Sequence, residues 1–323
     1  MTSRIRTAVV GLGYFGRFHA KHHAQNPDCD LVAVCDADAG TAKRLAEEHG
    51  CEALTDHLAL KGRVDAVSIA VPTTHHARVA RDLMDAGIHV LIEKPVTETV
   101  AEAEELLELA AARGLVLQVG HIESFSSVFK VLRERVRAPL YLEATRVGPW
   151  RGGRATDVSV VLDLMIHDLD LVMSLVDAPV ERVEGLGAPV LSGSEDMARA
   201  RLTFANGAIA DVTASRVAEA VDRRLRVFED GVLHECDFAA HVLTRKSVGS
   251  EAEDPIAVER TEIPREDSLG NEIAEFVACV RDGTAPTVGG RRGAEALRVA
   301  QLVMEDARAR LGRMSAQGRN SAA

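Results

Sequence analysis

The sequence predicts an α/β protein with two domains, a doubly wound parallel sheet followed by an α+β domain. Up to about residue 122, apolar strand candidates alternate with segments of helix length, which is the pattern of a parallel sheet with helices on both faces. Beyond that point, strand candidates follow one another through short turns. The 323 residues, 46% of them hydrophobic, suffice for two cores.

The first domain is expected to span residues 1–122. Its predicted strands are short apolar runs at Thr7–Val10, Leu31–Cys35, Ala66–Val71, His89–Ile92 and Val116–Val119. The segments between them that read as helices include Thr41–His49, His75–Ala86 and Val100–Ala112.

The second domain is expected to span residues 123–314, and residues 315–323 are expected to form a disordered tail because they are small and polar. Its predicted strands are Leu140–Val147, Ala198–Phe204, Ala208–Ala214 and Arg223–Phe228, with turns at Asn206-Gly207 and Asp230-Gly231. Helices are expected at Val160–Leu175, Leu269–Arg281 and Arg292–Leu311.

Charge and cysteine content exclude several classes of function. A formal net charge of −11 argues against non-specific binding to nucleic acid or to anionic membranes. No signal-peptide pattern precedes Ile5 and no apolar run is long enough to span a bilayer, so a soluble cytoplasmic protein is expected. The five cysteines lie far apart without a CxxC pair, which predicts reduced, mostly buried thiols and no metal site.

A glycine triplet, Gly11, Gly13 and Gly16, directly follows the first apolar run. In a strand–turn–helix unit, such glycines make the tight turn, let the backbone approach a pyrophosphate and let the helix pack on the strand. The N–H groups at the start of the following helix, expected at Phe15–Gln25, would face the phosphates. Asp36 ends the next strand about twenty residues on, where an acid binds a ribose. These features predict a dinucleotide site rather than a chance glycine-rich turn.

Asp36 also indicates which dinucleotide binds. A carboxylate at the end of the second strand accepts hydrogen bonds from ribose hydroxyls but repels a 2′-phosphate unless an arginine intervenes. The chain around it reads Cys35-Asp36-Ala37-Asp38, with no arginine before Arg44. The sequence therefore favours NAD over NADP.

Lys94 lies in Glu93-Lys94-Pro95, at the end of a predicted strand. Open parallel sheets bind ligands at the carboxyl ends of their strands, and a proline makes the chain leave the strand abruptly. Only six of the 38 basic residues are lysines, so a lysine kept at this position suggests a specific need. The alternative is an ordinary surface lysine on a loop.

Asp163 and His167 are spaced i, i+4 in the predicted helix Val160–Leu175, which would place them on one helical face. There the carboxylate can orient the imidazole, whose ordinary pKa near 6.5 suits a general base that takes a proton from an alcohol. The alternative is a helix-face hydrogen bond without catalysis. Asp168 and Asp170 are interpreted as supporting or solvated residues, not as metal ligands.

Two further groups of polar residues are candidates for contacts with the dinucleotide. Pro72-Thr73-Thr74-His75-His76 follows a strand, where the hydroxyls either cap the next helix or line the nicotinamide ribose. Along the first helix, His19 is a candidate contact beside the cofactor, while His22 and His23 are expected to be exposed.

Together these motifs resemble the Gfo/Idh/MocA oxidoreductase family along nearly the whole chain. The resemblance rests on Gly11-Leu-Gly-Tyr-Phe-Gly16 with His19, Pro72-Thr-Thr-His-His76, Glu93-Lys94-Pro95, Asp163 to His167, and Leu269-Gly-Asn-Glu-Ile-Ala-Glu-Phe276 followed by Pro286. It implies an N-terminal Rossmann domain and a C-terminal domain with an open, mostly antiparallel sheet that often mediates homodimers or homotetramers. It also implies that Lys94 and His167 form the catalytic pair with Asp163 beside them. The cofactor contacts it implies are Gly11, Gly13, Tyr14, Phe15, Gly16, Asp36, Pro72, Thr73, Thr74, His76, Glu93 and Lys94.

Within that family, the segments Val119 to Phe125, Arg146 to Trp150 and Asp157 to His167 look most like the enzymes that oxidise the 3-hydroxyl of UDP-N-acetylglucosamine during lipid A synthesis. The substrate contacts expected on this basis are His121, Arg146, Trp150, Arg151 and Arg154, since guanidinium groups match a diphosphate. Many relatives carry arginine and Asn-Pro at the positions of Ser124 and Ser126-Ser127, and the sequence leaves open whether Ser124 replaces a substrate contact. One alternative is a dehydrogenase of a free sugar or an inositol; another is an NAD-bound sensor without turnover.

Overall fold

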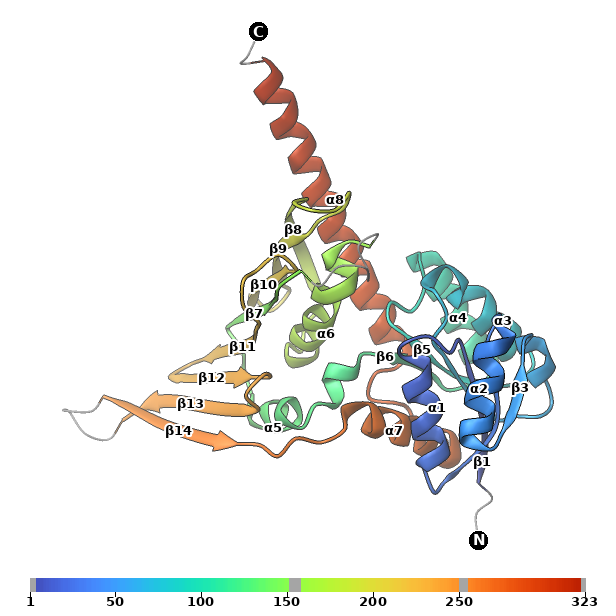
Figure 1. The fold of residues 1–323 in the computed structure, drawn as a ribbon. Helices are drawn as coiled ribbons and strands as arrows, with labels where there is room; N and C mark the ends of the chain where they lie inside the picture. The colour runs from blue at the N-terminus through green and yellow to red at the C-terminus, as the bar shows by residue number, and fades with distance from the viewer. Residues whose placement is uncertain (1–3, 151–157, 250–254, 321–323) are drawn as a thin grey trace. The chain divides into compact units, whose positions relative to one another are not determined.

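A computed structural model describes residues 4–150, 158–249 and 255–320 (Figure 1). The chain forms two compact units. Unit 1 comprises Met1–Phe125 and Asp267–Leu297, and unit 2 comprises Ser126–Glu266 and Arg298–Ala323. Neither unit is one continuous segment, whereas the sequence predicted two continuous domains.

Unit 1 is built around a six-stranded parallel sheet with the strand order β3-β2-β1-β4-β5-β6. Its strands are β1 (Ile5–Val10), β2 (Cys29–Cys35), β3 (Glu52–Leu54), β4 (Ala66–Ile69), β5 (His89–Glu93) and β6 (Leu117–Gly120). This order places the topological switch point between β1 and β4, where ligands bind doubly wound sheets. The predicted Rossmann architecture is confirmed, and only the three-residue strand β3 was not predicted.

The helices of unit 1 lie close to their predicted positions. They are α1 (Gly16–Gln25), α2 (Ala39–His49), α3 (His76–Met84) and α4 (Val100–Arg113), with short 3-10 helices η1 (His57–Leu60), η2 (Thr73–His75) and η3 (Ile122–Phe125). Local capping explains two of their boundaries. Asp38 caps α2 by accepting the Thr41 N–H, and Thr99 and Glu102 form a capping box at the start of α4.

Helix α7 (Ser268–Asp282) belongs to unit 1, although it follows the strands of unit 2 in the sequence. Its buried residues Leu269, Ile273 and Phe276 pack in one core cluster with Ala66 of β4 and Leu91 of β5. The C-terminal part of the chain therefore completes the hydrophobic core of the N-terminal domain.

Unit 2 contains an eight-stranded sheet with the order β14-β13-β12-β11-β7-β10-β9-β8. Its strands are β7 (Tyr141–Val147), β8 (Val180–Ala188), β9 (Met197–Phe204), β10 (Ile209–Ser215), β11 (Asp222–Glu229), β12 (Val232–Asp237), β13 (Val242–Val248) and β14 (Ile256–Glu262). Only the β7–β10 pair is parallel, so the expected mostly antiparallel sheet is confirmed. The turns at Asn206-Gly207 and Asp230-Gly231 lie where they were predicted, each with glycine at positive φ.

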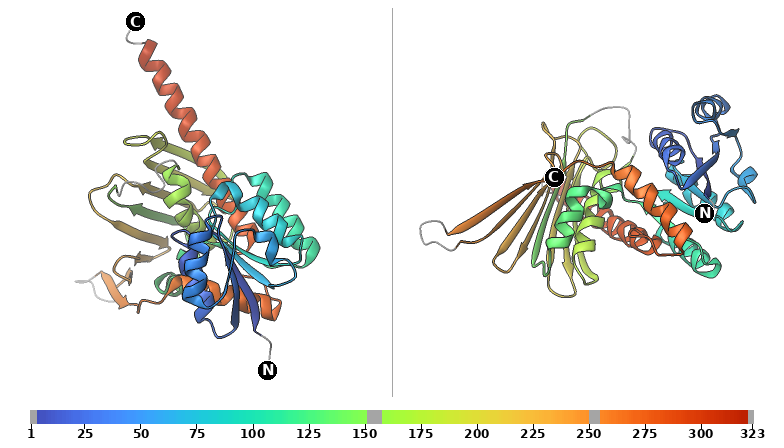
Figure 2. Two further views of the ribbon diagram at one scale, coloured as in Figure 1. Left: turned by 45° about the vertical axis from the view of Figure 1, so that its right-hand side comes forward. Right: turned by 90° about the horizontal axis from the view of Figure 1, so that it is seen from below.

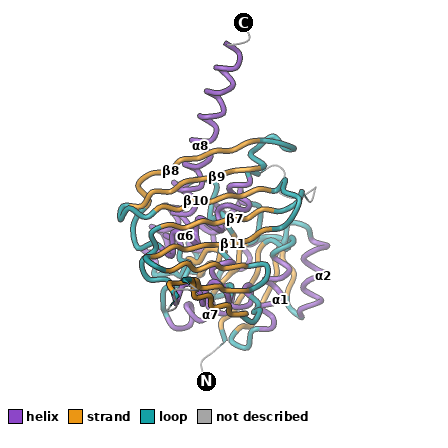
Figure 3. Tube along the Cα trace, turned by 90° about the vertical axis from the view of Figure 1, so that its left-hand side faces the viewer, coloured by secondary structure: helices purple, strands orange, loops and turns teal. Residues whose placement is uncertain are grey.

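Helices cover one side of this sheet. They are α5 (Ser127–Arg135) and α6 (Ile166–Leu175), and Figure 2 shows them on the same side. Figure 3 views the sheet from the opposite side, with β8, β9, β10, β7 and β11 in order. None of the described helices is long and apolar enough to cross a membrane.

Two helical predictions need correction. The segment expected as one α-helix is a π-helical stretch, η4 (Val161–Met165), that leads into α6. The tail expected to be disordered from Ser315 is helical as far as Asn320, because α8 (Gly290–Asn320) continues through it. Extending a formed helix needs no new nucleation, so small polar residues can prolong it.

Candidate functional site

The turn after β1 has the backbone geometry of a phosphate-binding loop. Gly11 has φ +87°, and a Cβ there would lie 2.6 Å from backbone atoms of Ala70 and Val71. A Cβ at Gly16 would lie 1.7 Å from the carbonyl oxygen of Gly11, so α1 can start here only with glycine. A Cβ at Gly13 would meet nothing within 4 Å, which leaves open space above the loop at the helix N-terminus. This arrangement fits a pyrophosphate.

Asp36 lies directly after β2 and faces the glycine loop. Its Oδ2 accepts a hydrogen bond from the Leu12 N–H at 2.7 Å, and its Oδ1 accepts one from the Asp38 N–H at 2.9 Å. The acid that was predicted to bind the ribose therefore also fixes the turn that approaches the phosphates.

A cavity of about 240 Å³ lies beside Asp36, and its walls include Gly11, Pro72, His75 and Arg78. It is continuous with the glycine loop through Gly11, so it suits the adenosine end of a dinucleotide. The fold brings Arg78 to this wall, although it lies 42 positions after Asp36 in the sequence. The side chain of Arg78 is 62% exposed, and its Nη1 lies 3.9 Å from Oδ2 of Asp82.

The threonines after β4 do not cap the following helices through their side chains, so that interpretation of them was wrong. Neither η2 nor α3 has a side-chain cap hydrogen bond; their N-cap residues are Pro72 and His75. His76 is buried, with Nδ1 2.9 Å from the carbonyl oxygen of Pro95 and Nε2 2.9 Å from that of Val71. Burial lowers the pKa of His76, while the two carbonyl groups beside its ring nitrogens act in the opposite direction.

Lys94 follows β5, and the residue before it is anchored to α1. Nε2 of His19 lies 2.8 Å from Oε1 of Glu93, and the His19 side chain is fully buried. Burial by itself would raise the pKa of Glu93, but the hydrogen bond to His19 and the charge of Lys94 outweigh it and lower that pKa. Glu93 is therefore an anionic partner of His19, and the Lys94–Pro95 peptide bond after it is cis.

The other histidines of α1 differ from the prediction that they are exposed. His23 is fully buried, with Nε2 2.8 Å from Oγ of Ser68 and Nδ1 3.7 Å from Sγ of Cys29. Burial lowers the pKa of His23 to about 3 and raises that of the Cys29 thiol to about 12. The side chain of His22 is 15% exposed. His19 and His23 are spaced i, i+4 and therefore lie on the same inward face of α1, so the prediction of an exposed His23 was wrong.

His121 and Ser124 lie at the end of β6 and in η3, and both are buried. The Ser124 N–H donates to the carbonyl of His121 at 3.0 Å. Oγ of Ser124 accepts a hydrogen bond at 2.6 Å from Arg292 in the part of α8 that belongs to unit 1. Arg292, which is 168 positions away in the sequence, thus binds Ser124, the residue for which the sequence leaves a substrate contact open.

Asp163 and His167 lie on either side of the change from π to α geometry in unit 2. Asp163 is in η4, where its N–H bonds to the carbonyl of Ser159 at 3.0 Å, and His167 is in the first turn of α6. The predicted i, i+4 pairing assumed a regular α-helix, which the structure does not have here. Short π segments are frequent at functional sites.

Arg146 and Trp150 were predicted to contact a substrate, and both have partners within unit 2. Nε and Nη2 of Arg146 donate to the two carboxylate oxygens of Asp168 at 2.8 and 3.0 Å, and this ion pair is buried. The guanidinium carbon of Arg216 lies 5.6 Å from the centre of the Trp150 ring. Arg151 and Arg154 lie outside the described residues.

The structure thus combines a doubly wound sheet, a glycine loop open at Gly13, an acid at the end of β2 and a lysine after β5. These features define a dinucleotide-binding protein of the dehydrogenase class. No group of three or more metal-ligating His, Cys, Asp or Glu side chains occurs among the described residues.

Comparison with known proteins agrees with this class. Residues 5–121 match the oxidoreductase family with an NAD-binding Rossmann fold, and residues 118–245 match the GFO/IDH/MocA C-terminal domain. The chain belongs to the Gfo/Idh/MocA family of oxidoreductases, which confirms the predicted family, fold and NAD cofactor.

Individual relatives are similar over most of their length. The UDP-N-acetylglucosamine 3-dehydrogenase of Acidithiobacillus ferrooxidans is 38% identical over 295 residues, which cover 89% of this chain and 93% of that enzyme. A solved structure of that dehydrogenase superposes with a TM-score of 0.91 at 36% identity, covering 95% of this chain and 98% of the other. The scyllo-inositol 2-dehydrogenase (NAD(+)) of Bacillus subtilis is 28% identical over 314 residues, covering 89% and 90% of the two chains.

Proposed function

We propose that this protein is an NAD-dependent dehydrogenase that oxidises the 3-hydroxyl of UDP-N-acetylglucosamine to a 3-keto sugar nucleotide. The observation that carries this proposal is the 38% identity to the Acidithiobacillus enzyme across 93% of its length. Lys94, Asp163 and His167 support it, because a lysine, a carboxylate and a histidine together suit oxidation of an alcohol.

In this proposal the N–H groups around Gly13 hold the pyrophosphate of NAD and Asp36 holds its adenosine ribose. NAD, when bound, supplies the hydride acceptor. His167 takes the proton of the substrate hydroxyl, and the Lys94 ammonium donates a hydrogen bond to the same oxygen as negative charge develops on it. Asp163 orients His167, and Glu93, held by His19, fixes the backbone at Lys94.

For the substrate, we propose contacts to His121, Trp150, Arg151 and Arg154. Trp150 offers a flat apolar face to a sugar or a base. Arg146 is the least suited of the predicted contacts, because two of its nitrogens already bind Asp168 in a buried pair.

The use of the product, the cell compartment and the oligomeric state are proposed on the same basis. The product is a 3-keto sugar nucleotide, which an aminotransferase of lipid A synthesis can consume. The five cysteines, all within the described residues, form no disulfide, which suits the reducing cytoplasm. The helix-free side of the sheet in Figure 3 suits a homodimer or homotetramer contact, which light scattering on the purified protein can test.

The test is NADH formation at 340 nm with UDP-N-acetylglucosamine, UDP-glucose, free N-acetylglucosamine, and scyllo- and myo-inositol. We expect the first to give the highest kcat/KM and a product that borodeuteride labels at C3. Raised salt should increase KM for the nucleotide, since the charges that bind a diphosphate are screened. Equal kcat/KM for the free sugar would contradict the proposal.

The second candidate function is oxidation of a free sugar or an inositol, which the similarity to the scyllo-inositol dehydrogenase favours. It predicts the highest kcat/KM for an inositol and no effect of removing the nucleotide. A third outcome, NAD binding without turnover of any compound in the panel, would indicate a sensor.

A further inference from the structure

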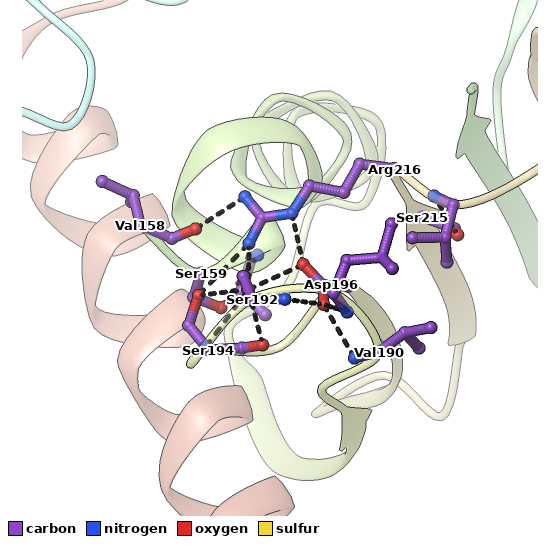
Figure 4. A network of polar contacts seen from close by, with 11 residues as sticks. Val158, Ser159, Val190, Ser192, Ser194, Asp196, Ser215 and Arg216 are labelled. Carbon is purple, nitrogen blue, oxygen red and sulfur yellow. Dashed lines mark hydrogen bonds and ion pairs between the residues drawn. The ribbon is translucent and has the colours of Figure 1, made fainter. Parts of the chain in front are cut away.

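Arg216 directly follows β10 in unit 2, and it is 8% exposed. Each of its three guanidinium nitrogens donates a hydrogen bond (Figure 4). Nε bonds to Oδ1 of Asp196 at 2.7 Å, and Nη1 bonds to the carbonyl of Val158 at 2.8 Å. Nη2 bonds to Oγ of Ser192 at 2.9 Å and to Oγ of Ser194 at 3.2 Å.

Asp196 anchors one side of this network. Its carboxylate is fully buried, and Oδ2 accepts the N–H groups of Val190, Leu191 and Ser192 at 2.7, 2.6 and 2.8 Å. Burial opposes the charge, but these N–H groups outweigh it and lower the pKa of Asp196. The loop between β8 and β9 therefore folds around one carboxylate, which accepts hydrogen bonds from three backbone N–H groups of the loop and from Nε of Arg216.

The other side of the network is the start of the helix that carries Asp163 and His167. The Val158 carbonyl binds Arg216, and the Val160 N–H binds the carbonyl of Glu195 at 2.9 Å. Residues 158–160 are thus fixed on both sides of Ser159, whose carbonyl accepts the Asp163 N–H at 3.0 Å. A shift of the Arg216 side chain would therefore move Val158 and the adjoining Ser159. The carbonyl of Ser159 would pass that movement to the N–H of Asp163.

Arg216 also lies near Trp150, which precedes the helix start in the sequence, because its guanidinium carbon is 5.6 Å from the centre of the Trp150 ring. One planar group therefore meets both Trp150 and Val158. A lysine could keep the charge but not this fork of directed donors.

We propose that Arg216 is a positioning residue that sets the place of Asp163 and His167 and of Trp150, acting through Val158 and the Asp196 loop. This inference rests on the proposed function for the roles of Asp163 and His167. Buried ion pairs are frequently no more stabilising than apolar groups of the same volume, so the pair by itself is weak evidence for a purely stabilising role. Directed geometry at the helix start accounts for the pair.

The test compares Arg216→Lys and Arg216→Met with Arg135→Lys. Arg135 is the matched control, since it forms an ion pair within the same unit, Nη1 to Oε1 of Glu259 at 3.3 Å, away from the helix start. For both Arg216 variants we expect kcat with UDP-N-acetylglucosamine to fall about 10- to 100-fold, as misplacement of reacting groups by about 1 Å does. The Kd for NAD should stay unchanged.

Two readouts do not depend on activity. Trp150 is the only tryptophan of the chain, so its emission should shift and acrylamide should quench it more strongly in both Arg216 variants. In Arg216→Lys, which keeps a cation beside the buried Asp196, hydrogen exchange in peptides covering residues 158–167 should accelerate about tenfold while the rest of unit 2 keeps its protection. The control should match the wild type in all readouts.

Each contrary outcome overturns the inference in its own way. Unchanged emission and exchange in both Arg216 variants would show that Arg216 positions nothing, whatever the activity. Faster exchange throughout unit 2 with a lower Tm in Arg216→Lys would show a general structural role; in Arg216→Met a lower Tm is expected in any case, because the Asp196 carboxylate is left buried without the guanidinium. If the wild type fails to oxidise UDP-N-acetylglucosamine, the proposed function falls, while emission and exchange still decide the positioning role.

Discussion

Oδ2 of Asp36 accepts the N–H of Leu12 at 2.7 Å, so the acid after β2 holds the glycine loop that follows β1. The same carboxylate is the proposed ribose acceptor. Loop geometry and cofactor choice are thus linked through one side chain, and substitutions at Asp36 should separate the two.

We expect Asp36→Ser to weaken NAD binding and to reduce discrimination against NADP, because the charge that repels a 2′-phosphate is gone. Arg78, in the wall of the same cavity, can then attract that phosphate, and adding Arg78→Met should remove the NADP binding gained. Asp36→Asn also lacks the charge but keeps a side-chain oxygen for the Leu12 N–H, so it should relax the discrimination against NADP as Asp36→Ser does while leaving the glycine loop in place. Titration of both cofactors decides, and an unchanged preference in Asp36→Ser would place the ribose elsewhere.

We expect Lys94→Ala and His167→Ala to lower kcat by a factor on the order of 10² to 10⁴ with NAD affinity nearly intact, since each removes a group that handles the substrate proton or oxygen. Asp163→Asn should cost less, because Asp163 orients and does not transfer. Lys130→Ala, on the exposed side of α5, is the control. Full turnover by His167→Ala would remove this mechanism.

The buried pair of Arg146 and Asp168 predicts a stability effect. Arg146→Met leaves the Asp168 carboxylate buried without its guanidinium partner, which should lower the free energy of unfolding by about 3 to 5 kcal/mol. Arg146→Met with Asp168→Leu should recover much of that loss. Urea unfolding of the three proteins checks this; unchanged stability with a raised KM would instead assign Arg146 to the substrate.

His23 predicts a pH dependence of stability. Its pKa is lowered by burial from 6.5 to about 3 in the folded protein, so between these values the unfolded chain binds the proton and the folded protein does not. Stability therefore falls as the pH falls below 6.5, by about 2 kcal/mol at pH 5 from this group. His23→Gln, which can still bond to Ser68, should lose that share of the slope. Urea unfolding at pH 7.5, 6 and 5 measures it, and equal slopes would contradict the assignment.

The parallel sheet and the glycine loop were predictable because their signals are local. Buried strands read as apolar runs, and Gly11 to Asp36 lie within one strand–helix–strand unit. The strands β8 and β12 to β14 were not predicted, since polar or charged residues lie among the apolar ones in β8, β12, β13 and β14 and leave no continuous apolar run.

The contacts that the sequence did not reveal join residues far apart in the chain. His19 and Glu93 are 74 positions apart, and Arg216 and Asp196 are 20 apart. An isolated histidine or arginine carries no signal of its partner, because the pairing depends on which strands become neighbours. The same holds for α7, whose amphipathic pattern predicts a helix but not the core that it covers.

The return of α7 to unit 1 affects the order of events during synthesis on the ribosome. The cluster that contains Ala66 and Leu91 is closed by Ile273, Phe276 and Val277, which emerge after every strand of unit 2. The apolar surface of the N-terminal part of unit 1 therefore stays uncovered until most of the polypeptide has been made. A fragment of the first 125 residues lacks α7 altogether, so its apolar surface would remain exposed. Expressing that fragment alone should therefore yield an aggregation-prone product.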